Sequence, residues 1–265
     1  MPRRDGYEPA LRARDPRGPR PARDPPADAR GTHPGATRAA AGGHADRDRQ
    51  VRTGIILAGG RASRFGENKL AADLDGTSLL EATMTAVAAV TDGIVVAGPG
   101  LPTGFRAGET PVALIRDVDP FAGPLAALAN VLGGADADPA HVAIVVGGDM
   151  PRLVPAVLRS MLDQLAQARG IEAVLLGRLP PSAGADDGQA PRRAVLPVAV
   201  RVDAALRAAT SALDSGHRSL QALVDRMAHA ELPPPTWLPF DPEANTLLDV
   251  DTTADLERIR RHDLR

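Results

Sequence analysis

The sequence predicts an α/β domain built on a mostly parallel sheet with helices on both faces. Short runs of almost continuous apolar residues, typical of strands buried on both faces, alternate with helical stretches at intervals that suit βαβ units. The chain has 265 residues, of which 43% are hydrophobic and 24% charged, so it is long enough for one large domain or two small ones. Only 2% of the residues are aromatic, which leaves Ala, Val, Leu and Ile to form the core.

Residues 1–50 differ in composition from the rest of the chain. This segment is rich in Arg, Asp, Pro, Gly and Ala and has almost no aliphatic pattern. Such a segment cannot bury enough apolar surface to offset the entropy of ordering it. We therefore expect a disordered tail over residues 1–50, which is either a functional tail or a mis-assigned gene start, and one folded domain over residues 51–265.

The expected strands, each a short apolar run, are 54–57, 93–97, 111–115, 142–146, 173–176, 194–200 and 246–250. The expected helices are 79–90, 123–131, 154–168, 203–213, 219–227 and 253–261. Thr77 or Ser78 is placed to cap the first helix, and Pro124 suits the first position of the second. Pro197 lacks an N–H for a strand ladder, so it predicts an edge strand or a bulge. The stretch 180–193 is expected to be a mobile loop and 233–235 a stiff connector.

A turn with paired glycines and positive charge follows the first apolar run. Gly59 and Gly60 allow backbone N–H groups to approach a ligand closely. Arg61, Arg64 and Lys69 follow, and Lys69 is the only lysine in the chain. Fixed positive charge beside such a turn offsets the charge of a phosphate chain, so the loop is predicted to bind phosphates. Its spacing fits neither the P-loop nor the G-x-G-x-x-G motif, which disfavours a GTPase switch and an NAD-dependent dehydrogenase.

Two carboxylate sites follow other predicted strands. Asp149 comes after the strand 142–146 and two glycines, at the edge where ligands collect in open α/β sheets. Carboxylate oxygens suit Mg²⁺, which also bridges to substrate phosphates, so metal binding is favoured over capping of the next helix. Asp117 and Asp119 follow the strand 111–115, where ligand binding and a turn or capping role have equal weight. The sequence shows neither a histidine cluster typical of zinc nor a His–Ser–Asp arrangement.

Charge and composition disfavour several other classes of protein. The net charge of −2 argues against a general nucleic-acid or membrane-surface binder. Cysteine is absent, which removes disulfides, thiolate catalysis and cysteine-ligated metal sites. No apolar run approaches the roughly 18 residues of a transmembrane helix, and the first residues lack the apolar core of an export signal. We expect a cytoplasmic enzyme with neither nucleic acid nor membrane as a partner.

Several motifs occur in an order typical of one family. The motifs are Leu57-Ala58-Gly59-Gly60 with Arg61, Arg64, Gly66 and Lys69; Asp117 with Gly123-Pro124-Leu125; Asp149-Met150-Pro151; Leu196-Pro197-Val198-Ala199; Gly216-His217-Arg218-Ser219; and Leu248-Asp249-Val250-Asp251-Thr252. With them, the chain resembles the nucleotidylyltransferase family that includes molybdenum cofactor guanylyltransferase, over about residues 53–260. Asp249 and Asp251 stand where guanylyltransferases commonly show Asn-x-Asn-Thr-Pro-Glu, which leaves the exact substrate open.

The resemblance implies a three-layer, Rossmann-like nucleotidyltransferase sandwich of the GT-A type. It implies transfer of GMP from GTP to a phosphate-bearing acceptor such as molybdopterin, with release of pyrophosphate. Mg²⁺ is the implied cofactor and Asp149 its implied ligand, and the implied catalytic residues are Lys69, Arg64 and Asp149. The residues implied in nucleotide binding are Leu57, Ala58, Gly59, Gly60, Arg61, Lys69, Asp117 and Asp149. Those implied on the acceptor side are Pro197, His217, Arg218 and Asp251.

The resemblance also implies partners. They are GTP and a molybdopterin-type acceptor, with transient contacts to other cofactor-biosynthesis proteins or molybdoenzymes, and the chain is expected to be a monomer. A phosphate acceptor is already ionised at neutral pH, so the reaction requires positioning and charge neutralisation but no general base. The alternatives are CTP or another nucleotide, a different acceptor phosphate, and a non-catalytic nucleotide-binding protein.

Overall fold

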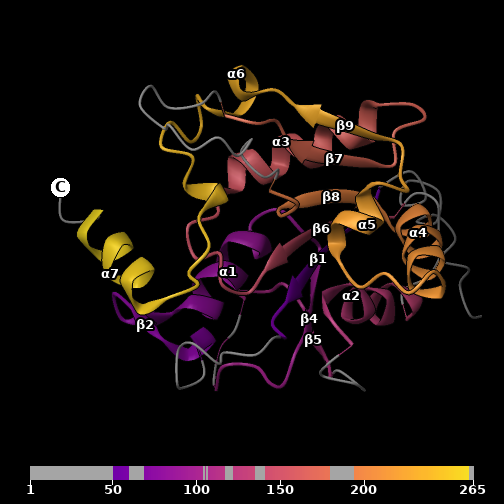
Figure 1. The fold of residues 1–265 in the computed structure, drawn as a ribbon. Coiled ribbons are helices and arrows are strands. Elements are labelled where there is room, and N and C mark those ends of the chain that lie inside the picture. Colours follow the sequence, from indigo (N-terminus) through magenta and orange to yellow (C-terminus); the bar gives the residue numbers. More distant parts are fainter. Residues whose placement is uncertain are drawn as a thin grey trace, which may run out of the picture. The chain divides into compact units, whose positions relative to one another are not determined.

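The computed structural model describes residues 50–59, 69–103, 105, 107–116, 122–134, 141–179 and 194–262, and Figure 1 draws them in colour. The strands are β1 Arg52–Leu57, β2 Asp73–Leu74, β3 Thr77–Ser78, β4 Gly93–Ala97, β5 Val112–Ile115, β6 Val142–Gly147, β7 Ala173–Leu176, β8 Val198–Arg201 and β9 His229–Leu232. The helices are α1 Leu79–Ala88, α2 Pro124–Gly133, α3 Pro155–Gln167, α4 Val202–Asp214, α5 Leu220–Val224, α6 Pro234–Trp237 and α7 Thr253–His262, with 3₁₀ helices η1 Lys69–Ala71 and η2 Asn245–Leu247. The predicted tail up to residue 49 and the predicted loop 180–193 lie outside the described residues.

Seven strands form one sheet in the order β5-β4-β1-β6-β8-β7-β9. The central strand of the parallel part is β1, which pairs with β4 on one side and with β6 on the other. The pairs β4–β5 and β7–β9 are also parallel, whereas β8 is antiparallel to both of its neighbours. The prediction of a mostly parallel sheet is therefore confirmed.

Helices cover both faces of the sheet and form two hydrophobic cores. On one face Ile56, Ile144 and Val146 pack with residues of α1 and α3, and on the other Ile55 and Val145 pack with residues of α2, α4 and α5. Figure 1 shows α1 on one side of β1 and β6, and α2, α4 and α5 together on the other. Every residue of β6 is buried because both faces of this strand are covered. This arrangement confirms the three-layer sandwich.

Two helices begin where the sequence predicted their starts. The Ser78 hydroxyl accepts the Glu81 N–H, and the Glu81 carboxylate accepts the Ser78 N–H, so the two residues form a capping box at the start of α1. Pro124 is the first residue of α2, where its missing N–H costs no helix hydrogen bond. The helix predicted at 219–227 is shorter, because beyond Val224 the backbone continues in tighter turns. No helix in the described part of the chain is long and apolar enough to span a membrane.

The structure corrects the prediction for Pro197. The strand that follows it, β8, is not at an edge but lies between β6 and β7. The ladder begins at Val198, which pairs with Val145 and Leu175, so Pro197 precedes the strand and removes no N–H from it. Because β8 is antiparallel, its first residues lie at the edge of the sheet where β6 ends.

The prediction of a strand at 246–250 is also wrong. The Asp241 carboxylate accepts the N–H of Asn245 at 2.9 Å and the N–H of Thr246 at 2.7 Å, and residues 245–247 form η2. These N–H groups are therefore used by a side chain and not by a neighbouring strand. Sequence patterns also gave no prediction of β9 or the β2–β3 hairpin, and the predicted connector 233–235 contains the start of α6.

Candidate active site

The carboxyl ends of β1, β4, β5 and β6 meet at one edge of the sheet. Backbone hydrogen bonds join the turns that follow these strands: the Ala58 N–H donates to the Ala97 carbonyl at 2.7 Å. The Gly148 N–H donates to the Leu57 carbonyl at 3.0 Å. A Cβ on Gly98 would lie 2.8 Å from the Ala58 Cβ, so glycine is needed for this close approach. The beginning of the glycine turn is thus held by both neighbouring strands.

Asp149 stands in the turn that follows β6. The missing side chain of Gly147 makes room for its carboxylate, because a Cβ there would lie 2.5 Å from Asp149 Oδ1. From α1, the Thr83 hydroxyl lies 3.2 Å from the Gly148 carbonyl and 3.0 Å from the Leu79 carbonyl, so its one proton is shared between the turn and the helix. Helix α3 begins only after Val154, which is its cap residue. The alternative that Asp149 caps this helix is therefore excluded.

The Lys69 ammonium lies between two carboxylates. Its Nζ donates to Asp149 Oδ2 at 2.8 Å and to Asp251 Oδ1 at 2.9 Å. The Lys69 side chain is 14% exposed and the Asp251 side chain 64% exposed, against 28% for Asp149, so Asp251 is the more exposed of the two carboxylates. Burial lowers the pKa of Lys69, but its hydrogen bonds and opposite charges outweigh burial and hold the pKa above the ordinary 10.5. The ammonium is thus charged and fixed at neutral pH.

A third carboxylate, Asp249, lies close to this pair. Burial raises its pKa above the ordinary 3.8, the charges of Asp251 and Asp149 raise it further, and Lys69 opposes them. In the described residues no three His, Asp or Glu side chains are arranged as a complete metal site. The donor set nevertheless fits Mg²⁺, because this ion commonly takes one or two carboxylates and completes its shell with water and substrate phosphates.

Backbone contacts fix the segment that carries Asp249 and Asp251. The Val250 N–H donates to the Asp149 carbonyl at 3.0 Å. Further back, the Val154 N–H donates to the Thr246 hydroxyl at 3.1 Å. These two bonds attach the C-terminal segment to both ends of the turn between β6 and α3.

The structure brings together part of the predicted site. The predicted residues found at this edge are Leu57, Ala58, Gly59, Lys69, Asp149 and Asp251. Pro197 reaches the same edge because β8 starts beside the end of β6. His217 and Arg218 lie beside the start of α2, the helix that follows β5, where a Cβ on Gly123 would be 3.3 Å from the Arg218 carbonyl oxygen. The predicted site residues outside the described part of the chain are Gly60, Arg61, Arg64 and Asp117.

Two features of the site were not predicted from the sequence. One is the direct contact of Asp251 with Lys69, and the other is the capping of η2 by Asp241. A signal for the first was present, because polar and apolar residues alternate over 248–251 and an extended chain places both carboxylates on one face. Asp241 has no comparable signal, since a buried carboxylate that accepts two backbone N–H groups depends on the local turn.

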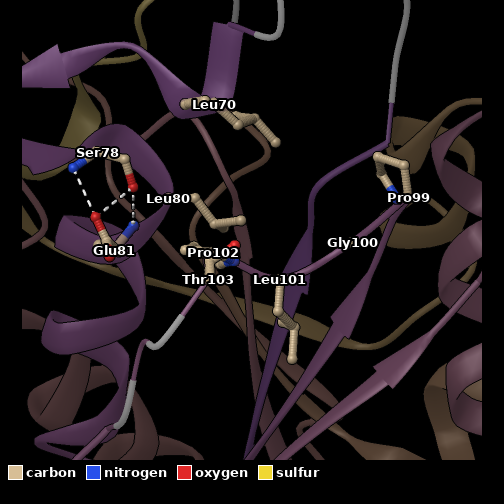
Figure 2. Close-up of a pocket in the computed structure, with 10 residues that line it drawn as sticks. Leu70, Ser78, Leu80, Glu81, Pro99, Gly100, Leu101, Pro102 and Thr103 are labelled. Carbon is tan, nitrogen blue, oxygen red and sulfur yellow. Dashed lines mark hydrogen bonds between the residues drawn. The ribbon is translucent and has the colours of Figure 1, made fainter.

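A cavity of about 510 Å³ adjoins η1, directly after Lys69 in the chain. The lining residues are Leu70, Ala71, Ser78, Leu80, Glu81, Pro99, Gly100, Leu101, Pro102 and Thr103 (Figure 2). The polar groups of Ser78 and Glu81 bond to each other, as the dashed lines in Figure 2 show. The remaining wall is largely apolar and the volume lies in the range of small-molecule sites, so the cavity suits an apolar portion of a ligand.

Comparisons of the sequence with known proteins identify its relatives. The model of the MobA-like NTP transferase domain matches residues 54–230. A probable molybdenum cofactor guanylyltransferase of Chloroflexus aggregans is 30% identical over 214 residues, which cover 79% of this chain and 94% of that protein. The molybdenum cofactor guanylyltransferase of Xanthomonas euvesicatoria pv. vesicatoria is 34% identical over 175 residues, which cover 64% of this chain and 77% of the relative.

Solved structures share the fold. Molybdopterin-guanine dinucleotide biosynthesis protein A from Archaeoglobus fulgidus has a TM-score of 0.62 at 19% identity, over 80% of this chain and 98% of that one. The 2-C-methyl-D-erythritol 4-phosphate cytidylyltransferase of Thermus thermophilus has a TM-score of 0.55 at 16% identity, again over 80% of this chain and 98% of that one. The family model covers more than half of the chain, and the chain belongs to the family of MobA-like NTP transferase domains.

Proposed function

We propose that this protein transfers GMP from GTP to the terminal phosphate of a molybdopterin-type acceptor and releases pyrophosphate. The observation that carries the proposal is the Lys69 ammonium against the Asp149 carboxylate, at the edge where the glycine turn begins. The names of the relatives support the choice of GTP and acceptor. The enzyme is proposed to act as a cytoplasmic monomer, with transient contacts to proteins that supply or receive the cofactor.

The proposed chemistry is an in-line displacement. An oxygen of the acceptor phosphate attacks the α-phosphorus of GTP, a new P–O bond forms, and the bond to the bridging oxygen breaks so that pyrophosphate leaves. The attacking phosphate is already ionised, so the chain need supply no general base. Arg61 and Arg64, which follow the glycine turn in sequence, are proposed to bind the phosphates together with Lys69.

The residues of the site would neutralise the negative charge of the phosphates. Asp149 would hold Mg²⁺, which when bound supplies charge neutralisation at the phosphates. Lys69 would donate to a phosphate oxygen from a position fixed by the turn after β6, so that little reorganisation is needed as charge develops. Leu57, Ala58 and Gly59 present the backbone of the glycine turn, and Asp117 is proposed to bind the sugar or the base edge.

A transfer assay with labelled nucleotides tests the proposal. The protein is incubated with molybdopterin, Mg²⁺ and either GTP or CTP carrying a labelled α-phosphate, and label in the acceptor is measured. We expect transfer from GTP, and near-complete loss for Asp149→Ala and Lys69→Ala with the fold preserved. Asp203→Asn removes a carboxylate from α4, where it pairs with Arg207, and serves as the control.

Each outcome has a defined meaning. Transfer from CTP alone would contradict the choice of nucleotide and leave the reaction type standing. Transfer to another phosphate acceptor, with none to molybdopterin, would contradict the acceptor. A chain that binds nucleotide but transfers none to any acceptor would be a binding protein, and the proposal would fail.

A further inference from the structure

The Lys69 ammonium has bonds for two of its three N–H groups. They donate to Asp149 Oδ2 at 2.8 Å and to Asp251 Oδ1 at 2.9 Å, and the third has no acceptor among the described residues. Two bonds to fixed acceptors determine how the ammonium is turned about its Cε–Nζ bond, and so they set the direction of the third N–H. A ligand oxygen can accept this third donor while both carboxylates stay in place. The direction of the free donor therefore depends on how firmly Asp149 and Asp251 are held.

Helix α7 holds the backbone of Asp251. Asp255, the third residue of α7, accepts the Thr252 N–H at 2.8 Å and the Asp251 N–H at 3.2 Å on its Oδ2. The Thr252 hydroxyl accepts the Asp255 N–H at 3.2 Å, which completes a capping box. The other oxygen of Asp255 accepts Arg258 Nη2 at 2.7 Å, from the next turn of the helix. A capping box needs only the bonds between Thr252 and Asp255, so the bond to Asp251 is additional.

A small third core attaches α7 to the rest of the site. Its members come from the β2–β3 hairpin, the start of α1, the segment before α7 and α7 itself, and they are Leu74, Leu79, Val250, Leu256 and Ile259. Val250, next to Asp251 in the chain, is fully buried, and Figure 1 shows α7 beside β2. Arg260 of α7 also donates to the Asp73 carbonyl of the hairpin. The hairpin follows η1, whose first residue is Lys69, so α7 contacts the segments that carry both partners of the ion pair.

We propose that Asp255 is a positioning residue for the candidate site. It holds the Asp251 backbone so that the Asp251 carboxylate meets Lys69 and the third N–H of the ammonium keeps one direction. Asp255 has no bond to Lys69 and acts only through Asp251. The geometric part of the inference requires no substrate. It rests on the proposed function only in its consequence for transfer, since a fixed donor at the phosphates stabilises charge as it develops.

The alternative is that Asp255 only caps α7. A cap supports the helix and leaves the ammonium unchanged, so the two roles differ at Lys69 itself. Lys69 is the only lysine of the chain, and full-length protein labelled with ¹⁵N-lysine therefore gives one side-chain ammonium signal by NMR. The order parameter of this group measures how firmly the ammonium is held. No nucleotide or acceptor is added, so the result does not depend on the proposed function.

Matched variants separate the bond to Asp251 from the cap. Asp255→Ala removes both, whereas Thr252→Ala removes the hydroxyl of the capping box and leaves the Asp255 carboxylate as acceptor for Asp251. Asp255→Asn is the conservative variant, because its amide oxygen can still accept both N–H groups. Asp251→Ala removes the contact with Lys69 directly, and its combination with Asp255→Ala completes a double-mutant cycle. Thermal unfolding of each variant measures the loss of stability that a cap would cause.

We expect the order parameter of Lys69 to fall below about 0.6 in Asp255→Ala, to stay near the wild-type value in Thr252→Ala, and to lie between these two in Asp255→Asn. Asp255→Ala should match Asp251→Ala, and the double variant should fall no further. In the transfer assay, Asp255→Ala should lower kcat about tenfold and change KM less. This is below the roughly 10²-fold cost of a misplaced catalytic group, because Asp149 still bonds to Lys69.

Three results would overturn the proposal. A wild-type order parameter in Asp255→Ala, with a lower melting temperature, would leave Asp255 as a cap alone. Equal losses in Asp255→Ala and Thr252→Ala, including losses through unfolding of α7, would show that the helix end and not the bond to Asp251 holds Lys69. A double variant below Asp251→Ala would show a route that bypasses Asp251. If the wild type transfers no nucleotide but the order parameters follow the expected pattern, the proposed function fails and the positioning role stands.

Discussion

Replacing Gly147 by alanine is expected to separate activity from stability. An added Cβ would lie 2.5 Å from Asp149 Oδ1, and Cβ contacts under 3.0 Å are essentially never found, so the oxygen must move by at least 0.5 Å. The neighbouring Met150 Cγ would be 3.5 Å from the Cβ, an ordinary contact that requires no movement. The clash therefore falls on the end of the side chain that bonds to Lys69 and leaves the backbone of β6 in place.

The expected magnitudes follow from that geometry. Moving the Asp149 carboxylate off its preferred rotamer costs about 0.5–1.5 kcal/mol. Gly147 has no positive φ, so alanine there lowers the conformational entropy of the unfolded chain and stabilises the fold by about 0.4–1 kcal/mol. The free energy of unfolding should thus change by less than about 1 kcal/mol. The transfer rate should fall by roughly 10²-fold, because a displacement of the order of 1 Å in a catalytic group has that effect.

Urea unfolding and the labelled-nucleotide transfer assay measure the two quantities on the same preparation. Gly133→Ala is the matched control, since a Cβ at this end of α2 has no neighbour within 4 Å. It should keep the wild-type rate and gain about 0.4–1 kcal/mol of unfolding free energy. A Gly147→Ala variant as active as this control would refute the reasoning about Asp149. A loss of more than about 3 kcal/mol in unfolding free energy would show that the backbone, and not the carboxylate, takes up the strain.

Two further substitutions test the surroundings of the site. Gly98→Ala should cost about 1–3 kcal/mol of unfolding free energy and weaken nucleotide binding, because its Cβ would lie 2.8 Å from the Ala58 Cβ. Gly100→Ala, whose Cβ would have no neighbour within 4 Å, is the control. Equal nucleotide affinities of the two variants by calorimetry would contradict the prediction. Ser78→Ala should cost about 1 kcal/mol at pH 7 in urea unfolding, because it removes half of the capping box. The Ser78 N–H and hydroxyl hold the pKa of Glu81 below its ordinary 4.5, so the contribution of Glu81 to stability is complete above that pH and is lost as the pH falls through the lower, folded value. The deficit of Ser78→Ala should therefore shrink below about pH 4.5, and a deficit independent of pH would argue against the carboxylate's part in the cap.

Patterns of local origin in the sequence predicted the fold well. The strands at 93–97 and 173–176 were predicted with their observed bounds, because runs of buried apolar residues bounded by turns indicate fully covered strands. Ser78 and Pro124 marked helix starts through the hydrogen bonds that helix ends lack. Such signals depend on a few neighbouring residues, so they can be read without knowledge of the tertiary structure.

The failures arose where a distant or specific contact decides the conformation. The strand order that places β8 in the interior depends on pairing with both β6 and β7, and Pro197 alone cannot reveal it. In place of the strand predicted at 246–250, residues 245–247 form a 3₁₀ helix whose first N–H groups donate to the Asp241 carboxylate, and residues 248–250 join no ladder. At the candidate site, the strand-end rule placed Lys69 and Asp149 at one edge. It could not give the hydrogen bond from Lys69 to Asp251. The alternation over 248–251 indicates that Asp249 and Asp251 share a face, but it does not indicate a partner 182 positions away.

The reversed direction of β8 has a consequence for how this fold can diverge. The residues that follow the parallel strands β1, β4 and β6 lie at the edge of the candidate site, and changes there disturb turns that hydrogen bonds tie to a neighbouring strand. In the antiparallel strand β8, the residues that precede the strand lie at that edge, and the ladder of β8 starts only at Val198. Residues 194–197 lead to the edge of the sheet that carries Lys69 and Asp149 and contribute no ladder pairs, so substitutions there can change this edge while the pairing of β8 stays intact. One edge of the sheet thereby combines turns that are tied to neighbouring strands with a segment, residues 194–197, that forms no ladder pairs.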